Sequence, residues 1–319
     1  MAITGQDIEQ AQNLLRSGKL VAIPTETVYG LAGNALDTDA VLSIFKTKNR
    51  PSFDPLIIHT DSIEKIKQWV THFPPELEAL AKAIWPGPLT ILLPKKNSIP
   101  DLVTSGLDYV AVRIPNHPLT LELLRGLDFP LAAPSANPFG YISPTCAKHV
   151  QQQLGELIPY ILDGGASEIG LESTIVTIEN GKLQLLRLGG LSLEQLEELT
   201  GQTVHLTINQ SSNPQAPGML KSHYAPRKPL YIGSISSLIE KNKDQKIGVL
   251  SFNTTYSEVV NLKVLSLNSN MLEASKNLFG YLRDLDQSDA ELLIAEFVPE
   301  TGLGRAINDR LRRAAHIEV

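Results

Sequence analysis

The chain has 319 residues, of which 42% are apolar and 19% are charged, and its formal net charge is −6. This composition is typical of a globular protein long enough for two hydrophobic cores, and it excludes a disordered or fibrous chain. No signal peptide or membrane span is visible, and the only cysteine, Cys146, allows neither an internal disulfide nor a thiolate metal cluster. We therefore expect a cytoplasmic protein with no membrane association.

Residues 1–206 predict helices that alternate with short strands. Apolar residues at helical spacing indicate the helices, and short apolar runs bounded by Gly or Pro indicate the strands. In chain order, we expect a helix at 8–17, a strand at 20–24, a helix at 40–48, a strand at 55–60, helices at 63–70 and 75–83, strands at 89–93 and 109–114, a helix at 119–125, a strand at 129–133, a helix at 147–154 and a strand at 160–163. Two further runs, at 173–178 and 183–188, are joined by Asn180-Gly181 and predict a β-hairpin before a last helix at 193–199.

Residues 207–228 differ in character from the chain on either side. They are rich in Asn, Gln, Ser, Pro and Gly, show no apolar periodicity, and hold 3 basic and 0 acidic residues. This pattern predicts a linker, although its centre, APGMLKSHYAP at 216–226, is not low-complexity sequence. Beyond it we expect strands at 230–232, 247–252, 264–267 and 292–296, with helices at 271–285 and 300–314.

The pattern predicts an α/β fold in two domains. Residues 1–206 form a twisted mixed sheet with flanking helices, because the hairpin makes the sheet partly antiparallel, and residues 229–319 form a small α/β, Rossmann-like unit. The first domain holds 15 basic and 22 acidic residues, net −7. It is therefore not basic enough to bind nucleic acid by phosphate neutralisation alone, although a local basic groove is compatible with that total.

A polar loop follows the strand at 129–133. Ser135, Asn137 and Ser143 carry small donors and acceptors, and Pro138 and Gly140 between them shape the turn. Such a run past a strand end is where α/β folds place ligands, although an ordinary polar loop has the same composition.

Four cations lie at the ends of predicted elements: Lys48, Arg50, Arg113 and Arg187. Such side chains hold phosphates or carboxylates, and singly each is also compatible with an ordinary surface cation. Arg113 stands out because it lies in the alternating strand VAVRIP, where burial without a partner is costly.

Three further polar residues have open roles. His59 ends an apolar strand and fits either a site or a satisfied structural histidine, and Ser173 fits either a ligand contact or a strand start. Glu26, in PTETVYG, is compatible with a general base or with a structural anion. No Walker loop, GxGxxG fingerprint, GxSxG elbow or histidine pair at metal spacing is present. The remaining inventory of cations, hydroxyls and amides suits a polyphosphate with a divalent ion.

Taken together, these stretches resemble the YrdC-like threonylcarbamoyl-AMP synthases in their two-domain form. The matching segments arrive in the family's order and cover the first domain and the linker: PTETVYGLAGNA from Pro24, KNRP from Lys48, PLIIH from Pro55, WPGPLT from Trp85, VAVRIPNHP from Val110, APSANPFGYISPT from Ala133, then LDGG, GLEST, LLRLGG from Leu185 and APGMLKSHYAP from Ala216. The departure is Leu188-Gly189-Gly190, where the family usually has Pro-Gly after the arginine.

The resemblance implies an ATP-dependent nucleotidyltransferase. It would join L-threonine, bicarbonate and ATP into threonylcarbamoyl-AMP, with pyrophosphate release, and Mg²⁺ would be held mainly by the ATP phosphates rather than by protein ligands. A separate protein complex would then transfer the threonylcarbamoyl group to the adenosine beside the tRNA anticodon. The resemblance places Thr25, His59, Arg113, Ser135 and Ser173 at threonine or its carbamate, and Lys48, Arg50, Thr104, Asn137, Ser143, Arg187 and Tyr224 at ATP.

Two other functions compete with this interpretation. The first is an RNA-binding module, against which the net charge of −7 on residues 1–206 argues as the main role. The second is a carbamoyl-adenylate enzyme of the hydrogenase-maturation type, whose additional acylphosphatase and zinc-finger units are excluded by one cysteine and this length.

Overall fold

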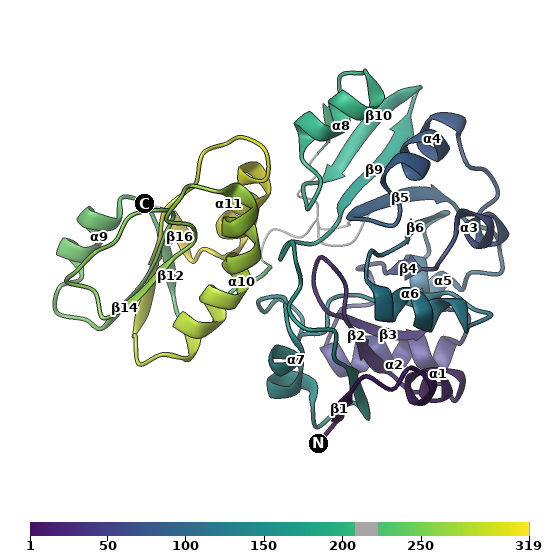
Figure 1. Cartoon of the computed structure of the whole chain (residues 1–319), viewed down its shortest axis with the longest axis horizontal. Helices are drawn as coiled ribbons and strands as arrows, with labels where there is room; N and C mark the ends of the chain where they lie inside the picture. Colours follow the sequence, from purple (N-terminus) through teal and green to yellow (C-terminus); the bar gives the residue numbers. More distant parts are fainter. Residues whose placement is uncertain (208–222, 319) are drawn as a thin grey trace.

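The structure is a computed structural model that describes residues 1–207 and 223–318. It shows two domains, each built on its own β-sheet (Figure 1). Most of the predicted linker, residues 208–222, lies outside the described residues. No helix in the described ranges is long and apolar enough to cross a membrane.

The first domain is organised around an 11-stranded mixed sheet with the order β1-β8-β2-β3-β7-β4-β6-β5-β9-β10-β11. Its elements are β1 (Ile3–Gly5), α1 (Ile8–Arg16), β2 (Val21–Ile23), β3 (Gly30–Asn34), α2 (Thr38–Lys48), β4 (Ile57–His59), α3 (Ile63–Trp69), α4 (Pro75–Ile84), β5 (Leu89–Pro94), α5 (Asp101–Thr104), β6 (Tyr109–Arg113), α6 (Pro118–Arg125), β7 (Leu131–Ala132), α7 (Ala147–Leu154), β8 (Tyr160–Leu162), β9 (Thr174–Glu179), β10 (Lys182–Arg187), α8 (Leu193–Thr200) and β11 (His205–Leu206). The predicted hairpin is confirmed, because β9 and β10 pair antiparallel.

Alternation along β2 shows how the sheet is covered on both faces. Val21 and Ile23 pack with residues of α1 and α6, whereas Ala22 between them belongs to the larger core that includes Ile44 of α2. Successive side chains of a strand point to opposite faces, so helices cover both sides of this part of the sheet. Because helices cover the faces of the sheet, a binding site is expected at the loops beside the strand ends.

The second domain is a five-stranded sheet with the order β14-β13-β15-β12-β16, in which every pairing is parallel. Its elements are β12 (Leu230–Ile232), α9 (Ile235–Lys241), β13 (Ile247–Ser251), β14 (Asn261–Val264), α10 (Met271–Gln287), β15 (Leu292–Ala295), α11 (Gly304–Ala314) and β16 (Ile317–Glu318). A parallel sheet with helical crossovers is the predicted Rossmann-like architecture. The fold class of both domains is therefore confirmed.

Helices α10 and α11 lie on the side of the second domain that faces the first (Figure 1). Arg283 of α10 is buried, and its guanidinium donates to the carbonyls of Ile142 and Ser143 in the polar loop of the first domain. The backbones also approach closely at Gly170, where an added Cβ would lie 2.6 Å from Lys276 Cα and 2.6 Å from the Ser275 carbonyl oxygen. The two domains therefore pack directly on each other.

The sequence pattern missed several short elements. Strand β3 follows directly after the loop at residues 24–29, and its sequence GLAGN lacks the β-branched and aromatic residues typical of strands. Small residues are needed there because an added Cβ on Gly33 would lie 2.9 Å from Leu20 Cδ2. The predicted start of the last helix at 300 was also wrong, because Gly302 adopts a φ of +53° and α11 begins at Gly304.

Candidate active site

A polar cleft lies where loops and strand ends of the first domain meet the described end of the linker. It is lined by Thr27, Val28, Arg50, Pro55, Leu56, Ile57, His59, Arg113, Ala133, Pro134, Ser135, Glu172, Ser173, Arg187, His223 and Tyr224. Seven of the twelve residues predicted at the site are in this lining: Arg50, His59, Arg113, Ser135, Ser173, Arg187 and Tyr224.

His59 and Arg113 end two neighbouring parallel strands. They are direct partners in the register of β4 and β6, so adjacent strand ends bring them to the same point of the cleft. Burial and the positive charge of Arg113 lower the pKa of His59 to about 3. The imidazole is therefore neutral at physiological pH and offers one donor and one acceptor.

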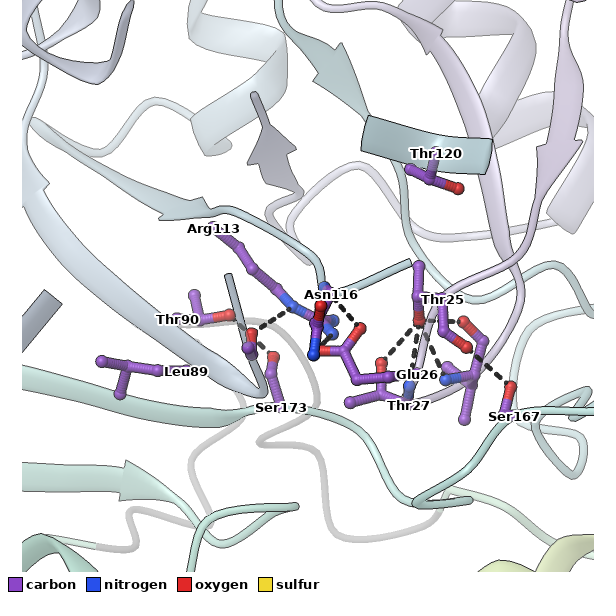
Figure 2. Close-up of polar contacts among 12 residues, drawn as sticks. Thr25, Glu26, Thr27, Leu89, Thr90, Arg113, Asn116, Thr120, Ser167 and Ser173 are labelled. Carbon is purple, nitrogen blue, oxygen red and sulfur yellow. Dashed lines mark hydrogen bonds and ion pairs between the residues drawn. The ribbon is translucent and has the colours of Figure 1, made fainter. Parts of the chain in front are cut away.

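Arg113 is held by Glu26, as Figure 2 shows. The Nη2 atom of Arg113 lies 2.8 Å from Oε1 of Glu26, as an ion pair that is not aligned as a hydrogen bond, and both side chains are about 4% exposed. The other carboxylate oxygen, Oε2, accepts the backbone N–H of Asn116 at 3.0 Å. Of the two roles left open for Glu26, this geometry favours the structural anion, because both oxygens are engaged by protein groups.

Thr25 shapes the loop that carries Glu26. Its Oγ1 accepts the backbone N–H groups of Thr27 and Val28 at 3.2 Å each and donates to the Val28 carbonyl at 2.6 Å (Figure 2). Ser167 Oγ donates to the Thr25 carbonyl at 2.9 Å. Thr25 does not line the cleft in this structure, and its role at threonine stays a prediction.

Ser173 and Arg187 form one cluster. Arg187 donates through Nε and Nη2 to the Ser173 carbonyl at 3.0 and 2.8 Å, and Nη2 also lies 3.0 Å from Ser173 Oγ. Ser173 Oγ shares a hydrogen bond of 2.7 Å with Thr90 Oγ1. Burial lowers the pKa of Arg187 to about 10, which still leaves the guanidinium charged at neutral pH. The two predicted binding regions therefore meet at Ser173.

The other predicted ATP residues are buried behind the cleft lining. Lys48 donates its ammonium to the carbonyls of Ser135 and Asn137, and burial together with Arg50 lowers its pKa well below the usual value. The Asn137 amide donates to the Pro138 carbonyl at 2.9 Å and the Tyr141 carbonyl at 2.8 Å. These side chains fix the polar loop in the state that the structure describes.

Ser143 and Thr104 also bond within the protein. Ser143 Oγ donates to Glu172 Oε1 at 2.6 Å, and Thr104 Oγ1 lies 3.4 Å from the Asp101 carbonyl. The structure therefore does not bring Lys48, Asn137, Ser143 or Thr104 to the surface of the cleft. Their contacts with ATP stay predictions.

Tyr224 covers one end of the cleft. Its side chain is buried, stacks on Phe279 of α10 at a centroid distance of 5.5 Å, and has the Arg310 guanidinium 5.1 Å from its ring centre. The neighbouring His223 packs edge-on against Phe139 of the polar loop. This end of the linker is thus held between both domains.

Two residues of this region were missed by the sequence reasoning. Glu172 lines the cleft, and its Oε2 pairs with Arg310 Nε of α11 at 2.9 Å. In the segment GLEST, Ser173 was predicted as a site residue and Glu172 was not. The partner of Glu172, Arg310, lies 138 residues later in the chain, and no local pattern indicates the pairing. The signal available in the sequence was a carboxylate directly before Ser173, a predicted site residue.

The acidic residues around the cleft form ion pairs with arginines. Glu26 pairs with Arg113 and Glu172 with Arg310, and Asp54 pairs with Arg50 at 2.9 Å. In the part of the chain that the structure describes, no group of three or more His, Cys, Asp or Glu side chains could hold a metal ion. This donor set fits Mg²⁺ that arrives with ATP better than Mg²⁺ bound by carboxylates, and that assignment stays a prediction.

Comparison with known families identifies both domains. The model of the Sua5–YciO–YrdC family, described as "Telomere recombination", matches residues 13–189, and the model described as "Threonylcarbamoyl-AMP synthase, C-terminal domain" matches residues 191–316. The threonylcarbamoyl-AMP synthase of Pyrococcus abyssi is 42% identical over 322 residues, which cover 97% of this chain and 94% of that protein. The chain belongs to the threonylcarbamoyl-AMP synthase family.

Other relatives agree with this membership. The threonylcarbamoyl-AMP synthase of Bacillus subtilis is 41% identical, with 97% of this chain and 92% of that protein covered. The crystal structure of P. abyssi Sua5 complexed with L-threonine matches with a TM-score of 0.94 at 39% identity, covering 100% of this chain and 99% of that one. The predicted family and two-domain form are confirmed, and the family is one of enzymes, as predicted.

Proposed function

We propose that the protein joins L-threonine, bicarbonate and ATP into L-threonylcarbamoyl-AMP and releases pyrophosphate. The observation that carries this proposal is the full-length similarity to threonylcarbamoyl-AMP synthases, one of which was crystallised with L-threonine. The cleft is in keeping with it, because a buried arginine, a neutral histidine and several hydroxyls line one continuous surface.

The threonine end of the cleft is built around Arg113. Its planar guanidinium suits bidentate recognition of the amino-acid carboxylate, and Glu26 holds it in place. His59, Ser135 and Ser173 lie beside it and supply neutral polar contacts for the amine and the side-chain hydroxyl. Bicarbonate takes up a proton and loses water to give CO₂. The uncharged amine of threonine then adds to the carbon of CO₂, and the nitrogen releases a proton to water, which gives a carbamate.

The second step is an in-line displacement at the α-phosphorus of ATP. A carbamate oxygen forms the new O–P bond, and the bond to the β-phosphate oxygen breaks, so pyrophosphate leaves with the electron pair. Arg50 and Arg187 line the cleft and would neutralise the phosphates, with Mg²⁺ adding charge neutralisation when it is bound with ATP. Lys48 lies behind the lining, where its ammonium holds the polar loop through the Ser135 and Asn137 carbonyls. Tyr224 excludes water, which protects a carbamate and a mixed anhydride that both hydrolyse easily.

The product then serves the modification of tRNA. In this proposal a separate protein complex transfers the threonylcarbamoyl group to the adenosine beside the anticodon. The reaction takes place in the cytoplasm, in keeping with a single cysteine among 319 residues.

Pyrophosphate release tests the proposal directly. With ATP and Mg²⁺ present, release is expected to require both L-threonine and bicarbonate. Equal release without threonine, or with any amino acid in its place, contradicts the assignment. The adenylated product itself is identified by mass spectrometry of the reaction mixture.

A further inference from the structure

One residue of the cleft lining, Glu172, belongs to a buried ion pair that joins the two domains. Glu172, in the loop before β9, is 7% exposed, and Arg310, in the middle of α11, is 1% exposed. Arg310 Nε lies 2.9 Å from Glu172 Oε2, and Nη2 donates to the Leu188 carbonyl at 2.8 Å. A buried pair of this kind is costly to break, because the remaining partner keeps its charge without compensation.

Glu172 contacts Ser143, which the proposed function gives to ATP. It lines the cleft together with Arg50 and Arg187, and its Oε1 accepts the hydroxyl of Ser143. A carboxylate at this place opposes a triphosphate, since like charges repel strongly where little water separates them. The cleft can accept ATP at this end only if that negative charge is cancelled.

Arg310 is fixed so that it acts on Glu172 and not on a ligand. Its Nη1 pairs with Asp309 at 2.7 Å, and Asp309 is held in turn by Arg313 at 3.0 Å. Its guanidinium also faces the ring of Tyr224. Each end of the guanidinium is thus directed at a protein group.

We propose that Arg310 is a positioning residue for ATP, which the second domain inserts in order to neutralise Glu172 and hold it against Ser143. This inference rests on the proposed function, and it gives the second domain an electrostatic part in nucleotide binding as well as a mechanical one. The buried geometry supports it, as does the lowering of the Glu172 pKa by Arg310 and Arg187 against the effect of burial.

The test compares three variants in steady-state pyrophosphate release: Arg310→Met, Glu172→Gln and the double variant. Methionine keeps much of the packing and removes the charge, and glutamine keeps the shape of Glu172 without its charge. We expect Arg310→Met to raise the KM for ATP by about tenfold or more and to change the KM for threonine by less than about threefold. The double variant is expected to recover most of the ATP affinity, because neither charge then remains.

A matched control is available at the edge of the same interface. Arg305 of α11 pairs with Glu194 of α8 outside the cleft lining, and both side chains are partly exposed. Arg305→Met therefore breaks another arginine–carboxylate contact between the domains and is expected to leave the KM for ATP unchanged. A rise equal to that of Arg310→Met would show that the effect is only domain attachment and would overturn the proposal.

The remaining outcomes also decide. An unchanged KM for ATP in Arg310→Met, or a double variant no better than the single one, overturns the inference. If Arg310→Met fails to fold by thermal unfolding, Glu172→Gln alone decides: an unchanged or lower KM for ATP supports the proposal, and a large increase overturns it. If the wild-type protein releases no pyrophosphate with ATP, threonine and bicarbonate, the proposed function is wrong. Failure of the proposed function can therefore be distinguished from failure of the inference about Arg310.

Discussion

The two ends of the cleft differ in how far they are prepared for a ligand. At the predicted threonine end, His59, Arg113, Ser135 and Ser173 line the cleft and only Thr25 of the predicted residues does not. At the ATP end, Arg50, Arg187 and Tyr224 line it, whereas Lys48, Thr104, Asn137 and Ser143 bond to other protein groups behind it. His59, Arg113 and Arg187 are the last residues of strands in the same sheet, whereas Arg50 follows helix α2 and Tyr224 belongs to the linker.

The difference lies in what fills each end. The threonine end is fixed by adjacent strands and by the loop that Thr25 braces, so its geometry exists before any substrate binds. The ATP end holds the ring of Tyr224 and the Glu172–Arg310 pair, both of which involve the second domain. In the proposed reaction, threonine would meet a surface that the first domain builds alone, whereas ATP would meet an end whose geometry depends on contacts with the second domain. Four measurements test this contrast.

The largest effect is expected from Arg113→Ala. Removal of a charge-assisted pair to the threonine carboxylate, which also leaves Glu26 unpaired, should weaken threonine binding by on the order of 2–5 kcal/mol. Calorimetric titration with threonine measures this loss, and the affinity for ATP should change little. Threonine binding within a few-fold of the wild type would remove Arg113 from the threonine end.

Tyr224→Ala tests the ATP end. The ring is buried between Phe279 and Arg310, so its removal leaves a cavity that water can enter beside the reacting groups. We expect turnover to fall by roughly ten- to a hundredfold through hydrolysis of intermediates and poorer ATP positioning. Tyr224→Phe keeps the stacked ring and serves as the control, with most of the activity retained. Full activity of Tyr224→Ala in pyrophosphate release would mean that this residue does not act on the reaction.

Acid should destabilise the fold through the buried histidine of the threonine end. His59 has a pKa of about 3 in the folded protein and about 6.5 when unfolded, so below pH 6.5 the unfolded chain binds a proton that the folded chain does not. Stability is thus complete above pH 6.5 and falls with pH, by about 2 kcal/mol at pH 5 from this residue.

Urea unfolding at pH 7 and pH 5 measures this loss in the free energy of unfolding. His59→Gln is the control, because the variant should lack the part of the pH dependence that comes from His59. His223, at the ATP end, is buried as well, and burial also lowers its pKa well below the usual value. If the ATP end opens easily, His223→Gln should change the pH dependence less than His59→Gln does. Equal effects would argue that both ends are equally fixed.

The smallest effect is expected from Glu26→Gln. The amide oxygen can still accept the Asn116 N–H, so only the pairing with Arg113 weakens. We expect the KM for threonine to rise by about fivefold, with an unchanged kcat and an unchanged pH profile. A general base would behave differently, since its loss lowers kcat by roughly a hundred- to ten-thousandfold and removes a limb of the profile.

Much of this site could be predicted because its residues lie at strand ends. Arg113 closes VAVRIP and His59 closes PLIIH, and the register of β4 and β6 places the two side by side. The pattern could not show β3. Its small residues are required by close packing against neighbours such as Leu20, which only the folded structure brings near. Local periodicity reports burial and not the identity of the neighbour.

Ion pairs were the least predictable part of the site. The sequence identified Glu26 as important and left its role open, because the partner Arg113 is 87 residues away and only the folded sheet brings them together. The Glu172–Arg310 pair spans two domains, so neither local pattern nor strand order could indicate it. Whether a buried carboxylate is a base, a ligand or a counter-ion depends on such contacts.

The close approach at Gly170 has a consequence for the whole molecule. A methyl group there would lie 2.6 Å from the backbone of α10, and the φ of +76° would add strain of its own. Gly170 lies two residues before Glu172, so any side chain at this position would act as a spacer that draws Arg310 away from its partner. A residue with no side chain, which contacts no substrate, thus sets how far the second domain reaches into the first.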